Sequence, residues 1–133
     1  MIAYDVQFTE PTDQRDDMAL YAAAGRARNL VFSTTEVNSK GGTDVLGGDA
    51  NLKPIHAIAA NALIPTDAGG VIRRFRYDVD GLKSFAVTAA ERATGRAINP
   101  RSFPGGGAWI DYVGPPGTVP GVSFSRVLQG KFP

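Results

Sequence analysis

Cysteine is absent from the 133 residues of the sequence, and histidine occurs once, as His56. The absence of cysteine excludes a disulfide framework, a thiolate metal site and a cysteine nucleophile. A histidine-based metal site would have to take its remaining ligands from several carboxylates. We therefore expect neither a bound metal nor another cofactor. The lack of disulfides does not decide the compartment, because an ordinary hydrophobic core can stabilise an exported domain of this size.

Long apolar runs and a charge imbalance are also missing. The sequence has no run of about 18 apolar residues that could form a membrane-spanning helix. The opening residues, Ile2–Phe8, have the pattern of a strand rather than that of a signal peptide. With 14 Lys and Arg residues against 13 Asp and Glu residues, the net charge is +1. Because the charges balance, the chain has no strong positive electrostatic potential that would attract nucleic acid, so we expect no nucleic-acid partner.

The glycine-rich stretches and the acidic residues do not form a catalytic motif. Gly41–Gly42 and Gly105–Gly107 match neither a P-loop, which needs a following Lys and Ser or Thr, nor a dinucleotide fingerprint. Asp5 and Glu10 resemble a carboxylate pair for acid/base chemistry, but no nucleophile or histidine accompanies them. We predict that the chain is not an enzyme.

The first 35 residues have the pattern of a βαβ unit. Ile2–Phe8 is apolar and rich in aromatic and β-branched residues, which predicts an inner strand. A helix is expected from about Gln14, capped by Asp13 or a neighbour, with acidic residues in its first turn. Asn29–Thr35 is a second strand, and a crossover helix of this length predicts that the two strands are parallel.

The remaining residues predict two or three further strands and three helices. Ser39–Gly48 contains four glycines and is expected to be a loop, with a short extended piece at Val45 and Leu46. Pro54–Ala62 carries Ile and Ala residues at helical spacing, which predicts a short helix. The other expected elements are a long strand at Gly70–Val79, a turn at Asp80–Gly81, a helix at Leu82–Thr94 stopped by Gly95, a strand at Trp109–Val113 and a helix at Ser123–Leu128.

These elements predict an α/β fold in a single domain covering residues 1–133. We expect a central, mostly parallel or mixed sheet of about four to five strands flanked by helices. A chain of this length can bury roughly two-thirds of the surface that its unfolded state exposes, which is enough for one core.

Five residues are candidates for contact with a ligand. Asp5 and Glu10 lie on and just after the first strand, and a parallel sheet leaves a crevice beyond the carboxyl ends of its strands. Arg73 and Arg74 could offer guanidinium groups to an anion, although pairing with a nearby aspartate is the interpretation we favour. Trp109 and Tyr112 are expected to place one ring in the core and the other in a groove or interface, and Tyr112 is the fifth candidate.

Three stretches of the sequence resemble a known sensory family. They are YDVQFTEPTD near the start, Gly69–Gly95, and Ala108–Phe132. Together they are similar to the CHASE type 2 domain found in actinobacterial adenylate or guanylate cyclases. Within them, Asp67, Gly70, Val71, Arg73 and Arg74 match a recurrent turn and arginine-pair signature. The other matching positions are Asp5, Phe8, Glu10, Asp16, Asp17, Leu20, Ser84, Phe85, Ala86, Asp111, Tyr112, Gly114, Pro115, Ser123, Phe124, Val127, Leu128 and Gly130.

The resemblance implies a non-catalytic input domain on the extracellular face of the membrane. Family members continue into another strand and then membrane helices, so we expect this chain to be a partial domain trimmed from a longer protein. The implied output is a class III nucleotide cyclase, with kinase outputs as other options in the family. The expected partners are an unknown small-molecule or ionic stimulus and a second copy in a homodimer. The alternative is a small-ligand binding or dimerisation module of a receptor kinase or other exported protein.

Overall fold

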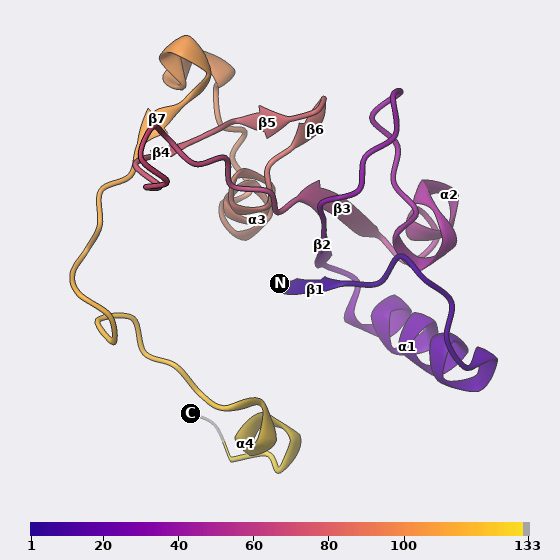
Figure 1. Ribbon diagram of the computed structural model, residues 1–133. Coiled ribbons are helices and arrows are strands. Elements are labelled where there is room, and N and C mark those ends of the chain that lie inside the picture. Colours follow the sequence, from indigo (N-terminus) through magenta and orange to yellow (C-terminus); the bar gives the residue numbers. More distant parts are fainter. Residues whose placement is uncertain (132–133) are drawn as a thin grey trace.

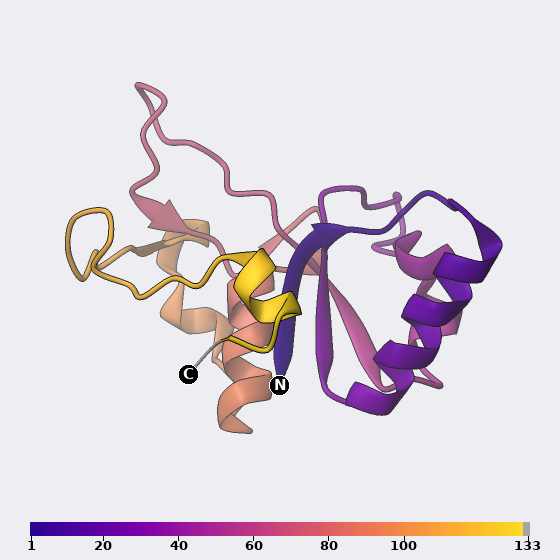
Figure 2. The same ribbon diagram turned by 90° about the horizontal axis from the view of Figure 1, so that it is seen from below.

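A parallel sheet between two layers of helices forms the centre of the computed structural model, which describes residues 1–131. The sheet has the strand order β1–β2–β3. Helices α1 and α2 cover one face, and α3 packs against β2 and β3 on the other (Figures 1 and 2). Phe132 and Pro133, which end the predicted domain, lie outside the described residues. The predicted α/β class with a parallel central sheet is confirmed.

The predicted βαβ unit is present. Strand β1 (Ile2–Gln7) pairs in parallel with β2 (Leu30–Thr34), and α1 (Gln14–Ala27) connects them. The Asp13 carboxylate caps the helix by accepting hydrogen bonds from the amides of Arg15 and Asp16, which satisfies two of the free N–H groups of the first turn.

The prediction that the first strand is an inner strand is wrong. β1 lies at the edge of the sheet, whereas β2 is its central strand and is buried over its whole length. Most residues of β1 are exposed, with Ile2 and Val6 each half-exposed. Apolar, β-branched composition fits either position, because an edge strand can also bury one face.

The main core lies between the sheet and the layer of α1 and α2. Leu30 and Phe32 of β2 project into it, and Tyr4 and Phe8 pack around the Phe32 ring at centroid distances of 6.3 and 5.9 Å. Burial of such rings contributes strongly to the stability of a domain of this size. The rest of the core cluster consists of Ala24, Val45, Leu52, Ile55, Ala57 and Ala59.

The helix predicted over Pro54–Ala62 is wrong. The segment contains strand β3 (Ala57–Asn61), which pairs in parallel with β2, while the helix α2 (Asp49–Leu52) precedes it. His56 has a left-handed backbone with φ of 55° and its amide donates to the Lys53 carbonyl, so the chain turns there and enters the sheet. The small side chains of β3 suit a strand that is covered on both faces.

The extended piece predicted at Val45 and Leu46 is wrong as well. These residues belong to a 3₁₀ turn at Val45–Gly47. Val45 is completely buried in the core, which explains why the glycine-rich loop returns to the body of the molecule at this point.

The single long strand predicted over Gly70–Val79 is also wrong. Asp67 and Val71 form an isolated bridge around Gly69 and Gly70, which both have positive φ. After this turn the chain forms only β4 (Arg74–Phe75) and β5 (Asp78–Val79), which belong to different two-stranded sheets.

The predicted Asp80–Gly81 turn is confirmed, but the helix that follows starts later than expected. Asp80 and Gly81 have φ of 53° and 78° and join β5 to β6 (Leu82–Lys83) as an antiparallel hairpin. Helix α3 spans Phe85–Thr94. The buried Ser84 precedes it and forms a parallel bridge to Asn61, which extends the edge of the central sheet beside β3.

The end of α3 and the last helix agree with the sequence. Gly95 adopts the left-handed conformation after α3, and its amide donates to the Glu91 carbonyl, so its prediction as the helix stop is confirmed. Helix α4 spans Phe124–Leu128, with Ser123 at the N-cap position.

The predicted strand Trp109–Val113 is shorter than expected, because β7 spans only Ala108–Trp109, paired with β4. The chain then leaves the body of the molecule and runs to α4 (Figure 1). The described strands therefore form a central sheet of three, rather than four to five, and two sheets of two.

Candidate functional site

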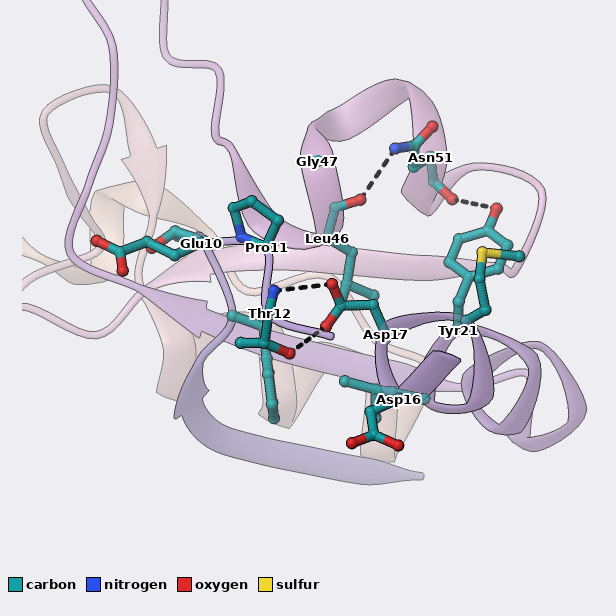
Figure 3. A pocket seen from close by; sticks show the side chains of 13 residues that line it. Glu10, Pro11, Thr12, Asp16, Asp17, Tyr21, Leu46, Gly47 and Asn51 are labelled. Atoms are coloured by element: carbon teal, nitrogen blue, oxygen red, sulfur yellow. Dashed lines mark hydrogen bonds between the residues drawn. The ribbon is translucent and has the colours of Figure 1, made fainter. Parts of the chain in front are cut away.

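A cavity of about 650 Å³ lies beyond the carboxyl end of β1 (Figure 3). The turn from Phe8 to Thr12 forms one side, the first two turns of α1 form another, and the segment from Leu46 to Asn51 forms the third. This is the position where α/β sheets commonly bind ligands, and the volume lies within the range of small-molecule sites. The thirteen lining residues are Phe8, Thr9, Glu10, Pro11, Thr12, Asp16, Asp17, Met18, Leu20, Tyr21, Leu46, Gly47 and Asn51.

Two hydrogen bonds between Thr12 and Asp17 fix the turn that enters α1. The Asp17 carboxylate accepts a hydrogen bond from the Thr12 hydroxyl at 2.6 Å and another from the Thr12 amide at 2.9 Å. These two bonds favour the ionised form and lower the pKa of Asp17 below its usual value. Asp17 therefore stays negatively charged and holds the wall of the cavity in place.

A second set of hydrogen bonds joins the other two walls. The Tyr21 hydroxyl donates to the Asn51 carbonyl at 2.8 Å, and the Asn51 amide group donates to the Leu46 carbonyl at 2.9 Å (Figure 3). The Leu46 amide in turn donates to the Phe8 carbonyl at 2.8 Å. Leu46 thus links the end of β1 to α2, and it does so with a left-handed backbone at φ of 51°.

The interior of the cavity is mainly apolar. Phe8, Leu20 and Leu46 are partly buried, and Phe8 is held by its contacts with the Tyr4 and Phe32 rings. Met18 is 59% exposed and lies at the mouth. A cavity with this lining suits an apolar body of modest size.

The charged groups of the cavity are all acidic. Glu10, Asp16 and Asp17 line it, and none of the lining residues is Lys or Arg. Figure 3 shows Glu10 and Asp16 at the rim with their carboxylates pointing outward. Neither forms a side-chain hydrogen bond or an ion pair within residues 1–131. The lining residues also include no His or Cys.

The structure does not bring the five predicted ligand residues together. Only Glu10 lines the cavity. Asp5 is exposed on β1, at a shallow hollow of about 440 Å³ that Ala3, Val6 and Phe124 also border.

Arg73, Arg74 and Tyr112 lie in a separate place, around the Asp67 turn. The Asp67 carboxylate accepts hydrogen bonds from the Arg74 guanidinium and from the Arg73 amide. The Arg74 side chain lowers the pKa of Asp67, and Asp67 raises that of Arg74. The Tyr112 hydroxyl donates to the Ile72 carbonyl. These contacts agree with the structural interpretation of the arginine pair, and a ligand role for these residues stays a prediction.

Several residues of the cavity were not singled out from the sequence. Tyr21 falls within the helix expected from about Gln14, and Asp17 is a first-turn acidic residue that also matches the CHASE type 2 pattern, but neither was predicted to contact a ligand. Leu46 lies within Ser39–Gly48, for which the sequence predicts a loop with a short extended piece, and Asn51 follows this segment, so neither was expected at a cavity. The one signal available was the spacing of Thr12 and Asp17, which allows a hydroxyl before a helix to reach a carboxylate within its first turn.

Two negative findings apply to residues 1–131. In this range the structure contains no cluster of three or more His, Cys, Asp or Glu residues that could hold a metal ion. Nor does any of the described helices combine the length and the apolar character that crossing a membrane requires.

Comparison with known proteins gives one match. The sequence profile of the CHASE2 domain matches residues 1–133. No curated protein and no solved structure matches the chain.

Proposed function

The chain belongs to the CHASE2 domain family of extracellular sensory domains, and from this we propose that it binds a small ligand outside the cell and passes the signal to a cytoplasmic output domain. CHASE2 domains are sensory and not catalytic. The output we propose is a class III adenylate or guanylate cyclase, connected through flanking membrane helices. The bacterial source we propose is actinobacterial.

The observation that carries this proposal is the cavity beyond β1. Three separate segments form its walls, and they are joined by hydrogen bonds that Asp17 accepts and that Tyr21 and Asn51 donate. A ligand that contacts two of these segments can favour one arrangement of the domain over another. A difference in binding free energy of roughly 1–3 kcal/mol between two arrangements would change the output by about 5 to 150-fold.

The lining supports an organic cation with an apolar body as the ligand. Apolar side chains would enclose the body, and Tyr21 offers an aromatic ring for contact with a positive group. Glu10 and Asp16 place negative charge at the mouth, where their exposed side chains can turn toward a bound ammonium group. An anionic ligand would meet three carboxylates and no balancing cation.

Two probes of opposite charge test this ligand class on the domain. Phenethylammonium and 3-phenylpropanoate share an aromatic body, so thermal unfolding in millimolar amounts of each separates charge from shape. We expect the cation alone to raise the unfolding midpoint by several degrees, because a ligand that binds only the folded state stabilises it. Met18→Arg should remove the shift by filling the mouth with a positive side chain. Asp111→Asn, which removes an exposed carboxylate outside the cavity, should preserve it.

The proposed transmission of the signal from this domain to the output domain is tested in the complete membrane protein that carries the domain. If a binding cation changes nucleotide cyclisation, Met18→Arg should remove that response and leave the basal rate unchanged, whereas Asp111→Asn should respond normally. A shift with the anion instead would overturn the ligand class but not the sensory role. Binding without any change in output would favour the alternative, a ligand-binding or dimerisation module of a receptor kinase or other exported protein.

A further inference from the structure

The molecule exposes far more surface than a compact monomer of its size. Its accessible surface is 9325 Å², and its mass is 14.0 kDa. The scaling observed for folded monomers gives about 6,700 Å² for this mass, which leaves an excess of about 2,600 Å². A protein–protein interface of standard size removes about 800 Å² from each partner, so the excess is ample for a stable interface.

Much of the exposed apolar surface belongs to the arm, which we define as residues 113–131. Every residue of the arm is exposed, and Val113 and Leu128 are each 78% exposed. Within residues 1–131, the hydrogen bonds of the arm run to other residues of the arm. Its other large apolar side chains are Val119, Val122, Phe124 and Val127. Clusters of exposed large apolar side chains commonly mark protein–protein interaction sites.

A second uncovered surface is the outer edge of β1. This strand pairs with β2 on one side only, and Ile2 and Val6 are each 50% exposed. An edge strand with exposed apolar side chains is a ready site for association unless another element covers it. Phe124, the first residue of α4, borders the hollow on β1. Phe124 is nevertheless 69% exposed, so this contact leaves both surfaces open.

The two surfaces have complementary charge. Arg126 and Lys131 are the only charged residues of the arm, and both are positive. Asp5 is the only charged residue of β1, and it lines the hollow that Phe124 borders. Complementary charges at the edge of an apolar interface favour the correct pairing and disfavour pairing of like surfaces.

We propose that the arm of one copy covers β1 of a second copy, and that the same contact is made in return. Such a two-fold arrangement is self-complementary, because each copy supplies one arm and one strand edge. It covers the exposed side chains of both surfaces at once, and it places Arg126 of one copy near Asp5 of the other. The proposal concerns a surface separate from the ligand cavity and does not depend on the proposed ligand.

Solution mass gives the first test. We expect the protein to have a mass of about 28 kDa at roughly 100 µM in light scattering and to dissociate on dilution. Leu128→Asp should weaken association at least about tenfold, because a charge would enter the covered surface. Ile64→Asp alters another exposed apolar residue, outside the arm and β1, and should leave association unchanged. Both positions are exposed, so circular dichroism should report a normal fold for each variant. A mass of 14.0 kDa for the unchanged protein at this concentration would overturn the proposal.

Site-specific crosslinking identifies which surfaces meet. The sequence has no cysteine, so single substitutions give an unambiguous background. One tagged copy would carry Asp5→Cys and a differently tagged copy Phe124→Cys, and we expect a disulfide that joins the two tags. Ala23→Cys on the exposed face of α1 is the matched control and should form no bond with Phe124→Cys. Equal crosslinking of the control would contradict the proposal.

The same cysteine pair should be placed in the complete protein that carries this domain. We expect the bond to join two copies there as well. Alkylation of the thiol introduced by Phe124→Cys then shows what covers the arm. If the thiol is protected, and loses this protection only when other residues of the same longer chain are removed, those residues cover the arm. In that case the second copy does not. A bond found only within one chain would have the same consequence. Neither result would affect cation binding in the cavity, so failure of this proposal is distinct from failure of the proposed function.

Discussion

Two neighbouring carboxylates of α1 have different surroundings and allow a matched comparison. Asp17 accepts both hydrogen bonds from Thr12, whereas the Asp16 side chain forms none within residues 1–131. Asp17→Asn and Asp16→Asn each remove one negative charge from the same helical turn. We predict that only Asp17→Asn lowers the thermal unfolding midpoint clearly at pH 7, as measured by circular dichroism. Equal losses would assign the effect to the helix dipole alone.

The effect of Asp17 should depend on pH in a defined direction. An aspartate in an unfolded chain titrates near pH 3.9, and the Thr12 bonds lower the pKa of Asp17 in the folded state. The stabilisation is therefore complete above the unfolded pKa and is lost as the pH falls through the lower folded pKa. The gap in unfolding midpoint between the natural protein and Asp17→Asn should stay constant from about pH 8 to 5 and narrow below about pH 4.

A buried amide joins the central sheet to the hairpin of β5 and β6. Asn61 is 1% exposed, its amide group donates to the Val79 carbonyl at 2.9 Å, and its oxygen accepts from the Leu63 amide. We predict that Asn61→Ala destabilises the fold by about 2 kcal/mol in urea unfolding, because buried hydrogen bonds to the Val79 carbonyl and the Leu63 amide are lost. Asn29→Ala is the control, since the buried side-chain oxygen of Asn29 has no hydrogen-bond partner in the described part of the chain, and it should cost much less.

At the level of single residues, the sequence predicted helix ends better than it predicted the cavity. Asp13 and Gly95 act through backbone groups a few residues away, so their roles follow from local order in the chain. The contact of Tyr21 with Asn51 spans 30 residues, and nothing in the spacing of the two residues indicates it. Glu10 was found because it follows a strand, which is again a local signal.

Among the elements, the β5–β6 hairpin depends on its two turn residues. Asp80 and Gly81 both have positive φ, a conformation that fits the twist of a two-residue hairpin and that only glycine adopts without cost. We predict that Gly81→Ala destabilises the fold by about 1 kcal/mol in urea unfolding. Gly121→Ala, at a position without positive φ and with open space around the α-carbon, should have no measurable effect. An equal loss in both variants would contradict this explanation.

The elements that the sequence predicted wrongly share a cause. The residues of β3, Ala57–Asn61, are mostly alanine, and alanine favours a helix unless the tertiary structure decides otherwise. Here the strand lies between two helical layers, where small side chains allow close approach. Asp67 has a comparable effect on the next segment, because its contact with Arg74 stabilises a turn where the alternating pattern predicted a long strand. Such long-range effects leave no periodic signal in the sequence.

For the whole molecule, the arm should differ sharply from the body in its resistance to proteolysis. Arg126 lies in the arm, whereas Arg26 lies in the last turn of α1, which packs against the core. We predict that trypsin cuts first at Arg126 in dilute solution, and that the rate of this cut falls as the protein concentration rises and copies associate. Mass spectrometry of the first fragments would identify the site. A first cut within residues 1–109, or a rate independent of concentration, would be contrary to this expectation.

The cavity and the arm occupy different parts of the chain, and this separation has a consequence for how related proteins can diverge. All thirteen lining residues fall between Phe8 and Asn51, while the arm begins at residue 113. Substitutions that alter the proposed ligand recognition therefore need not disturb the proposed association of copies, and the reverse also holds. β1 borders the proposed interface but supplies none of the lining residues, so the two properties can evolve independently.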